Sequence, residues 1–106
     1  MSNVLKGLMA SIGTLAVLAA APALAQSDYP AQPITVVVPF SAGGPTDTVT
    51  RLIAQRMSTE LGQQVLVQNV GGAGGTLGAG QVAQAKPDGY TLLLHHIGMS
   101  TAPTLY

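Results

Sequence analysis

Apolar residues change their spacing along the chain in a regular way. Residues 34–38 read Ile-Thr-Val-Val-Val, a nearly continuous apolar run that is typical of a strand covered on both faces of a parallel sheet. From Asp47 the apolar residues recur at helical spacing with polar residues between them; they are Val49, Leu52, Ile53, Met57 and Leu61. This pattern predicts an amphipathic helix that begins near Pro45 and stops at Gly62.

The same alternation continues along the chain. Residues 65–67 predict a second strand, and a second helix is expected over residues 76–85, weakened by two glycines in its early turns. After the turn-forming sequence Pro-Asp-Gly at 87–89, residues 90–94 predict a third strand. The order β-α-β-α-β indicates an α/β fold with a parallel sheet. Three strands and two helices leave a sheet edge and helix faces uncovered, so we expect the chain to be the first part of something longer.

The beginning of the chain has the pattern of an export signal. Lys6 precedes an uncharged run rich in Ala, Leu and Val that ends in Ala-Leu-Ala at 23–25. We therefore expect residues 1–25 to be a secretory signal peptide that is cleaved before Gln26. The alternative is an uncleaved membrane anchor. Residues 26–32 are expected to be disordered.

Charge and composition exclude several classes of function. After residue 25 the chain carries three basic and four acidic side chains, which gives a net charge of −1, and its aromatic residues are far apart. A nucleic-acid site needs a basic stripe or stacking aromatic side chains, so no nucleic-acid partner is expected. The sequence has no cysteine, which excludes disulfides and thiolate sites.

Two glycine-rich segments follow the first two predicted strands, at residues 40–44 and 71–75. In an open parallel sheet, such loops gather at the carboxyl ends of the strands, where ligands bind. Both loops are expected to offer unpaired backbone N–H groups and helix N-termini to one shared place. That place favours an anion, which is a carboxylate, a phosphate or a developing oxyanion.

The glycines do not fit a nucleotide site. A P-loop needs a lysine after its glycines, and neither segment has one. Residues 78–83 match the relaxed dinucleotide pattern Gly-x-Gly-x-x-Ala, but they lie inside the predicted helix, and Gly98 stands where an acidic ribose ligand is expected. No cofactor is therefore expected. The Gly-x-Ser-x-Gly elbow of a hydrolase is absent as well, so an enzyme is not expected.

Several residues of these loops have two interpretations. Gly43 and Gly44 either form a tight turn or present their amides to a carboxylate. Ser41 either donates to the ligand or caps the turn. Asp47 either satisfies N–H groups of the helix and pairs with the arginine four residues on, or binds a hydroxyl or ammonium group of a ligand. Thr76 either completes the second loop or caps its helix.

Two adjacent histidines, His95 and His96, follow the third predicted strand. Neighbours on an extended chain point to opposite faces, and no third metal ligand is in view, so no metal is expected. One of the two is a candidate hydrogen-bond donor to the ligand, because this loop opens on the same side of the sheet. Met99 and Ser100 are expected to lie in that loop too.

Longer motifs carry a resemblance to a known family. They are Tyr-Pro-x-x-Pro-Ile from Tyr29, Pro-Phe-x-x-Gly-Gly-x-x-Asp from Pro39, Gly-Gly-Thr at 74–76, Pro-Asp-Gly-Tyr at 87–90 and Leu-Tyr at 105–106. Over residues 29–106 the chain resembles the amino-terminal segment of the Bug/TctC family, the periplasmic solute-binding receptors of tripartite tricarboxylate transporters. It departs from the family where the usual Asn-Arg-x-Gly reads Asn-Val-Gly-Gly from Asn69.

The resemblance implies a Venus-flytrap receptor of the type II periplasmic-binding-protein class. Residues 26–106 would be the amino-terminal part of its first lobe, with the second lobe absent. Such a receptor captures a small carboxylate, such as a di- or tricarboxylate or another acidic metabolite, in the periplasm and presents it to the membrane subunits of the transporter. The candidate ligand-binding residues are Phe40, Ser41, Ala42, Gly43, Gly44, Asp47, Ala73, Gly74, Gly75, Thr76, His95 and His96. The alternative is a truncated, exported remnant that binds no ligand.

Overall fold

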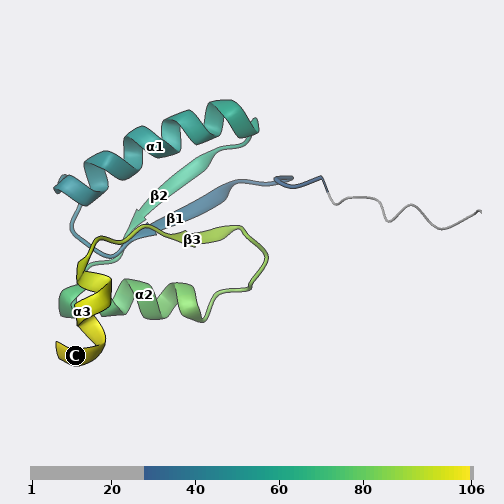
Figure 1. The fold of residues 1–106 in the computed structure, drawn as a ribbon. Helices are drawn as coiled ribbons and strands as arrows, with labels where there is room; N and C mark the ends of the chain where they lie inside the picture. Colours follow the sequence, from purple (N-terminus) through teal and green to yellow (C-terminus); the bar gives the residue numbers. More distant parts are fainter. Residues whose placement is uncertain (1–27, 106) are drawn as a thin grey trace, which may run out of the picture.

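The computed structural model describes residues 28–105 and shows a three-stranded sheet between two helices (Figure 1). The strands are β1 (Ile34–Val38), β2 (Val65–Asn69) and β3 (Thr91–Leu93). They are parallel and lie in the order β2-β1-β3. The predicted α/β fold with its parallel sheet is confirmed. The expected signal peptide and its cleavage site lie outside the described residues.

Two helices cover opposite faces of the sheet, α1 (Pro45–Leu61) and α2 (Thr76–Ala83) (Figure 1). The predicted ends of α1 are confirmed: Pro45 occupies its first turn, and Gly62 is left-handed, with its N–H donating to the Ser58 carbonyl at 3.1 Å. A short 3-10 turn, η1 (Ala73–Gly75), precedes α2. The second helix ends at Ala83, two residues earlier than predicted.

The centre of the core is β1, as its apolar run predicts. This strand pairs with β2 on one side and β3 on the other, and Ile34, Val37 and Val38 are at most 1% exposed. Among the described residues, β2 and β3 pair only with β1, so each leaves one edge open. Their residues are accordingly only half-buried or exposed.

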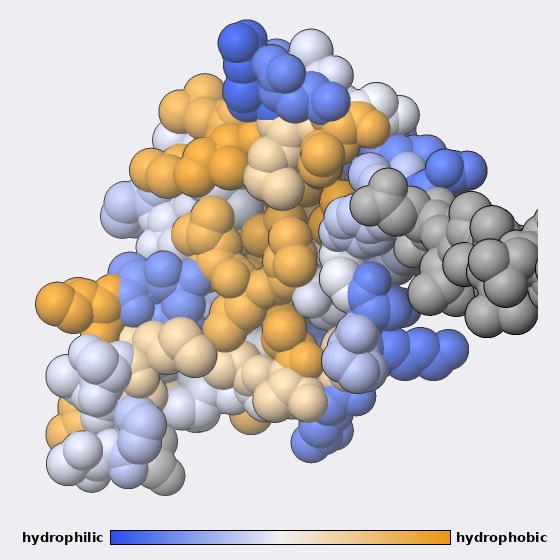
Figure 2. Space-filling view, turned by 45° about the vertical axis from the view of Figure 1, so that its right-hand side comes forward, coloured by the Kyte–Doolittle hydropathy of each residue, from blue (hydrophilic) through white to orange (hydrophobic). Residues whose placement is uncertain are grey.

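The face of α1 that packs on the sheet is not the apolar face that the sequence predicts. An amphipathic helix usually packs its apolar residues against the core, but the buried residues of α1 are Asp47, Thr50 and Ala54. Leu52 is 65% exposed and Val49 is 50% exposed. Small and hydrogen-bonded side chains therefore hold α1 on the sheet. The apolar residues contribute instead to an exposed hydrophobic surface, which forms a broad band on the face seen in Figure 2.

Two further expectations about loops are wrong. Residues 28–32 are not free of the fold: Tyr29 donates to the Gly89 carbonyl, its ring lies 5.0 Å from that of Tyr90, and the Ala31 N–H donates to the Tyr90 hydroxyl at 2.8 Å. Met99 and Ser100 do not lie in a loop but in a third helix, α3 (Gly98–Leu105). None of the helices that the structure describes reaches the length and apolar character that crossing a membrane requires.

Candidate functional site

The loops after all three strands meet at the carboxyl end of the sheet. A Cβ atom placed on Gly75 would lie 2.7 Å from Nε2 of His95 and 3.2 Å from the Phe40 ring. A Cβ on Gly71 would lie 3.6 Å from the backbone nitrogen of Ser41. The glycine loop after β2 therefore packs directly on the loops that follow β1 and β3. The structure brings the candidate segments together at one place, as their position after parallel strands predicts.

Three aromatic rings form the middle of this junction. Phe40 stacks on His96, with ring centres 4.3 Å apart and planes 15° from parallel, and meets His95 edge-on at 5.1 Å. The expectation that the two histidines point to opposite faces is wrong, since their rings lie 5.1 Å apart against the same phenylalanine. The reason is that the chain is no longer extended here. The His96 N–H donates to Nδ1 of His95 at 2.8 Å, and the Gly98 N–H donates to Nδ1 of His96 at 2.9 Å.

The loop after β1 is a tight turn from Ser41 to Gly44. The Gly44 N–H points to the Ser41 carbonyl at 3.4 Å, and Gly43 has a φ of +84°, which is the geometry of a type II turn. The Gly43 N–H donates to Oδ2 of Asp47 at 2.8 Å. Both glycine N–H groups are thus used inside the loop. The tight-turn interpretation of these two glycines is the one that the geometry favours.

The carboxylate of Asp47 faces this loop from inside the protein. Oδ2 also accepts from Nε of Arg51 at 3.0 Å, which confirms the predicted ion pair, and Oδ1 accepts from the Asn69 side-chain amide at 3.0 Å. Asp47 is only 3% exposed. The hydrogen bond from Arg51, followed by those from Gly43 and Asn69, lowers the pKa of Asp47 from 3.8 to about 2. Asp47 therefore stays ionised and holds the turn, and its oxygens are already occupied by these donors.

Asn69 also belongs to this network, although it is not among the site residues predicted from the sequence. Its side-chain nitrogen donates to the Phe40 carbonyl at 3.1 Å as well as to Asp47, and its oxygen accepts from Arg51 at 3.2 Å. A polar residue at the carboxyl end of a strand, directly before a glycine loop, was the signal that could have identified it. Asn69 ties the ends of β1 and β2 to the first turn of α1.

The loop after β2 is bonded within itself in a similar way. The N–H of Gly75 donates to the Gly72 carbonyl at 3.0 Å, and the Thr76 hydroxyl donates to the Ala73 carbonyl at 2.9 Å. The capping residue of α2 is Gly75, so the interpretation of Thr76 as the helix cap is wrong. Thr76 instead fixes the turn that precedes the helix.

Several backbone N–H groups near these glycines remain open. Within residues 28–105 no acceptor is found for the backbone N–H groups of Ser41, Ala42, Thr46, Ala73 and Gly74. All but Thr46 are exposed, and Thr46 lies in the first turn of α1, where the helix dipole is positive. Neutral N–H donors from two loops and a helix end can hold a carboxylate or another anion. In the described part of the chain, no group of three or more His, Cys, Asp or Glu residues is placed to hold a metal ion.

Comparison with known proteins identifies the family to which the chain is related. Residues 49–106 match the family described as tripartite tricarboxylate transporter family receptor. The chain belongs to this family, Bug/TctC. It is 64% identical over 84 residues to a UPF0065 protein from the TAR-I ttuE-ttuC' intergenic region of Agrobacterium vitis. That match covers 24% of the relative and 79% of this chain. It is 42% identical over 105 residues to protein BugT of Bordetella pertussis, which covers 92% of this chain and 32% of BugT.

Solved structures show the same fold over part of their length. The periplasmic binding protein BugD is 60% identical with a TM-score of 0.72, and the match covers 74% of this chain and 26% of BugD. MatC from Rhodopseudomonas palustris, solved with bound malate, is 57% identical with a TM-score of 0.59 over 61% of this chain and 22% of MatC. Another R. palustris protein, solved with adipate, is 44% identical with a TM-score of 0.61 over 62% of this chain and 22% of that protein. The chain thus spans about a quarter to a third of the length of the relatives it matches.

Proposed function

We propose that this chain supplies one side of a carboxylate-binding site in a periplasmic receptor of the Bug/TctC family. The observation that carries the proposal is that the loops with the open N–H groups pack together at the carboxyl end of the sheet. These groups belong to Ser41, Ala42, Thr46, Ala73 and Gly74. Relatives with this fold have been solved with malate and with adipate, both of which are dicarboxylates. Binding requires no bond to be made or broken, so the proposed role is a receptor and not an enzyme.

The charges around the loops suit a carboxylate held by neutral donors. Asp47 is the carboxylate nearest to the turn, and Arg51 is paired with it at 3.0 Å. The negative charge of Asp47 is therefore compensated before a ligand arrives. Backbone N–H groups and the positive end of α1 then replace the water that hydrates a free carboxylate.

The candidate residues divide into three roles in this proposal. Exposed loop residues donate their N–H groups, and the glycines at 43, 44 and 75 give the loops their shape. Asp47 positions the first turn without touching the ligand. Phe40 and the two histidines form the wall between the loops. Because Nδ1 of His96 accepts the Gly98 N–H, its neutral ring carries the proton on Nε2, which makes that atom a further donor.

The proposed place of action is the periplasm. A signal peptide over residues 1–25, cleaved before Gln26, would export the chain, and residues 26–106 would form the amino-terminal part of the first lobe. The proposed partners are a small carboxylate and the membrane subunits of a tripartite transporter.

A single substitution tests the role of the loop amides. Ala42 is the second residue of the type II turn, a position where proline is common, so Ala42→Pro keeps the turn and removes one open N–H group. We expect it to weaken malate and adipate binding by about tenfold or more, the effect of losing one hydrogen bond to a charged group. Ala42→Ser, which keeps the N–H group, is the matched control. Calorimetric titration of the three proteins measures the affinities.

The outcomes separate the proposal from the alternative. Equal affinity of Ala42→Pro and Ala42→Ser would show that this N–H group does not hold the ligand. Absence of any carboxylate binding by the unmodified chain would favour the other expectation, a chain that by itself binds no ligand.

A further inference from the structure

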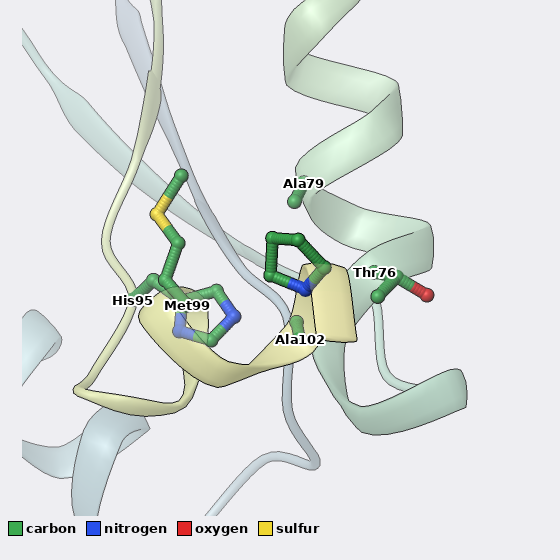
Figure 3. A pocket seen from close by; sticks show the side chains of 6 residues that line it. Thr76, Ala79, His95, Met99 and Ala102 are labelled. Carbon is green, nitrogen blue, oxygen red and sulfur yellow. The ribbon is translucent and has the colours of Figure 1, made fainter. Parts of the chain in front are cut away.

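A small pocket lies between α2 and α3, beside the proposed carboxylate site (Figure 3). It has a volume of about 230 Å³ and is lined by Thr76, Ala79, His95, Met99, Ala102 and Pro103. His95 and Met99 lie on one side of it, and Ala79 and Thr76 of α2 lie on the other. Whole-ligand pockets for drug-sized molecules measure roughly 300–1,000 Å³, so this pocket has the size of a subsite for part of a ligand.

The lining of the pocket is almost entirely apolar. The side chains of Ala79, Met99, Ala102 and Pro103 carry no nitrogen or oxygen atoms that could bond a ligand, and the Thr76 hydroxyl is already bonded to the Ala73 carbonyl. His95 is the one titratable residue in the lining, and its Nδ1 lies against the backbone of His96, at 2.8 Å from the nitrogen and 3.0 Å from the oxygen. None of the charged side chains of residues 28–105 lines it; these are Asp28, Asp47, Arg51, Arg56, Glu60, Lys86 and Asp88. Apart from Nε2 of His95, which faces Gly75, the lining offers no partner to a charged group, and burying an unpartnered charge is costly.

The pocket shares two residues with the loops of the proposed carboxylate site. Thr76 belongs to the turn of the second glycine loop and also lines the pocket. His95 lines the pocket as well, and its Nε2 edge faces the backbone of Gly75. A group attached to a carboxylate bound at residues 73–76 would therefore pass Thr76 and His95 as it enters the pocket.

We infer that the pocket between α2 and α3 holds an uncharged hydrocarbon end of the ligand whose carboxylate is bound by the loops. This inference rests on the proposed function and narrows it to a class of ligand: carboxylates with an apolar end of a few carbon atoms. In this chain, a monocarboxylate binds better than a dicarboxylate with the same number of carbon atoms, because the second carboxylate of the latter has no partner in the pocket.

Two matched series of acids test the inference with the full chain. Calorimetric titration with acetate, butyrate and hexanoate is expected to show affinity that rises by about fourfold for each methylene group buried. Succinate has as many carbon atoms as butyrate, and adipate as many as hexanoate. Each dicarboxylate is expected to bind at least about tenfold more weakly than its partner, as an unpaired buried charge requires.

Variants that fill the pocket complete the test. Ala79→Leu is expected to lower the affinity for hexanoate toward that for acetate, and Ala83→Leu, the same change in α2 outside the pocket lining, leaves the series unchanged. Ala102→Leu fills the pocket from α3 and serves if Ala79→Leu does not fold. Acetate binding without any gain for hexanoate, or hexanoate binding that both filling variants leave unchanged, would overturn the inference and leave the carboxylate site standing. Absence of binding of every acid would overturn both.

Discussion

The side-chain nitrogen of Asn69 lies 3.0 Å from Oδ1 of Asp47 and joins the end of β2 to the first turn of α1. The same nitrogen donates to the Phe40 carbonyl, and the Asn69 oxygen accepts from Arg51. One buried carboxylate and one amide therefore hold the loop from which the open N–H groups project. Neither side chain needs to touch a ligand in order to shape its site.

Replacing Asn69 by Ala is expected to lower the free energy of unfolding by about 1–3 kcal/mol, because the Phe40 carbonyl and Asp47 lose a donor. Urea denaturation measures the change. Gln68→Ala, at an exposed neighbour on the same strand, is the control and should stay within about 0.5 kcal/mol of the unmodified chain. Equal losses for the two variants would contradict the role assigned to Asn69.

The lowered pKa of Asp47 predicts a loss of stability in acid. The folded state holds this pKa at about 2, whereas the ordinary value is 3.8. The contribution of Asp47 is therefore complete above pH 3.8 and is lost as the pH falls toward 2, because the unfolded chain takes up the proton first. Denaturation curves measured between pH 2 and pH 3.8 should show the free energy of unfolding of the unmodified chain falling with pH. Asp47→Asn should lack the part of this fall that comes from Asp47. Parallel pH profiles for the two proteins would contradict the assignment.

Two glycines with positive φ should respond differently to alanine. Gly43 has a φ of +84°, and a Cβ added there would have no atom within 4 Å. Gly43→Ala is therefore expected to lower the free energy of unfolding by only about 1–2 kcal/mol, through backbone strain. Gly75 has a φ of +94°, and its Cβ would also meet His95 at 2.7 Å and Phe40 at 3.2 Å. Gly75→Ala should therefore lower the free energy of unfolding by more than Gly43→Ala. Denaturant titration compares them, and equal costs would argue against the close packing of the three loops.

The two glycines inside α2 offer a test with opposite signs. A Cβ on Gly78 would lie 2.7 Å from Cβ of Pro39 and 2.9 Å from the Val70 carbonyl oxygen, so Gly78→Ala should destabilise the fold. A Cβ on Gly80 meets nothing within 4 Å, so Gly80→Ala should stabilise the helix by about 0.5–1 kcal/mol. Thermal unfolding of both variants measures the two shifts. A change of the same sign in both would contradict the packing of α2 on the end of β1.

Local patterns were enough to predict the elements whose own residues determine them. The β-branched run of β1 and the Pro45 and Gly62 limits of α1 are such cases. The buried face of α1 was not predictable in this way, because it depends on the partners that Asp47 finds on another strand. The third helix contains Gly98 and Pro103, which are poor helix formers, so its residues gave no helical signal.

The location of the candidate site could be predicted from the sequence, but the individual hydrogen-bond donors could not. Glycine loops after parallel strands identified where the three segments meet. Which N–H groups stay open depends on contacts such as that of Gly43 with Asp47, which no spacing in the sequence reveals. The same holds for Gly78 inside α2. A glycine is needed there because Pro39, which directly follows β1, lies too close for a side chain.

An amide proton–nitrogen NMR titration of the chain with malate would locate the carboxylate site residue by residue. We expect the largest shifts at the residues whose N–H groups are open, which are Ser41, Ala42, Thr46, Ala73 and Gly74. The Gly43 amide, which is bonded to Asp47, should move less. Saturating malate that leaves these five amides unchanged, or moves only residues far from the three loops, would contradict the claim that backbone donors at the carboxyl end of the sheet bind the carboxylate.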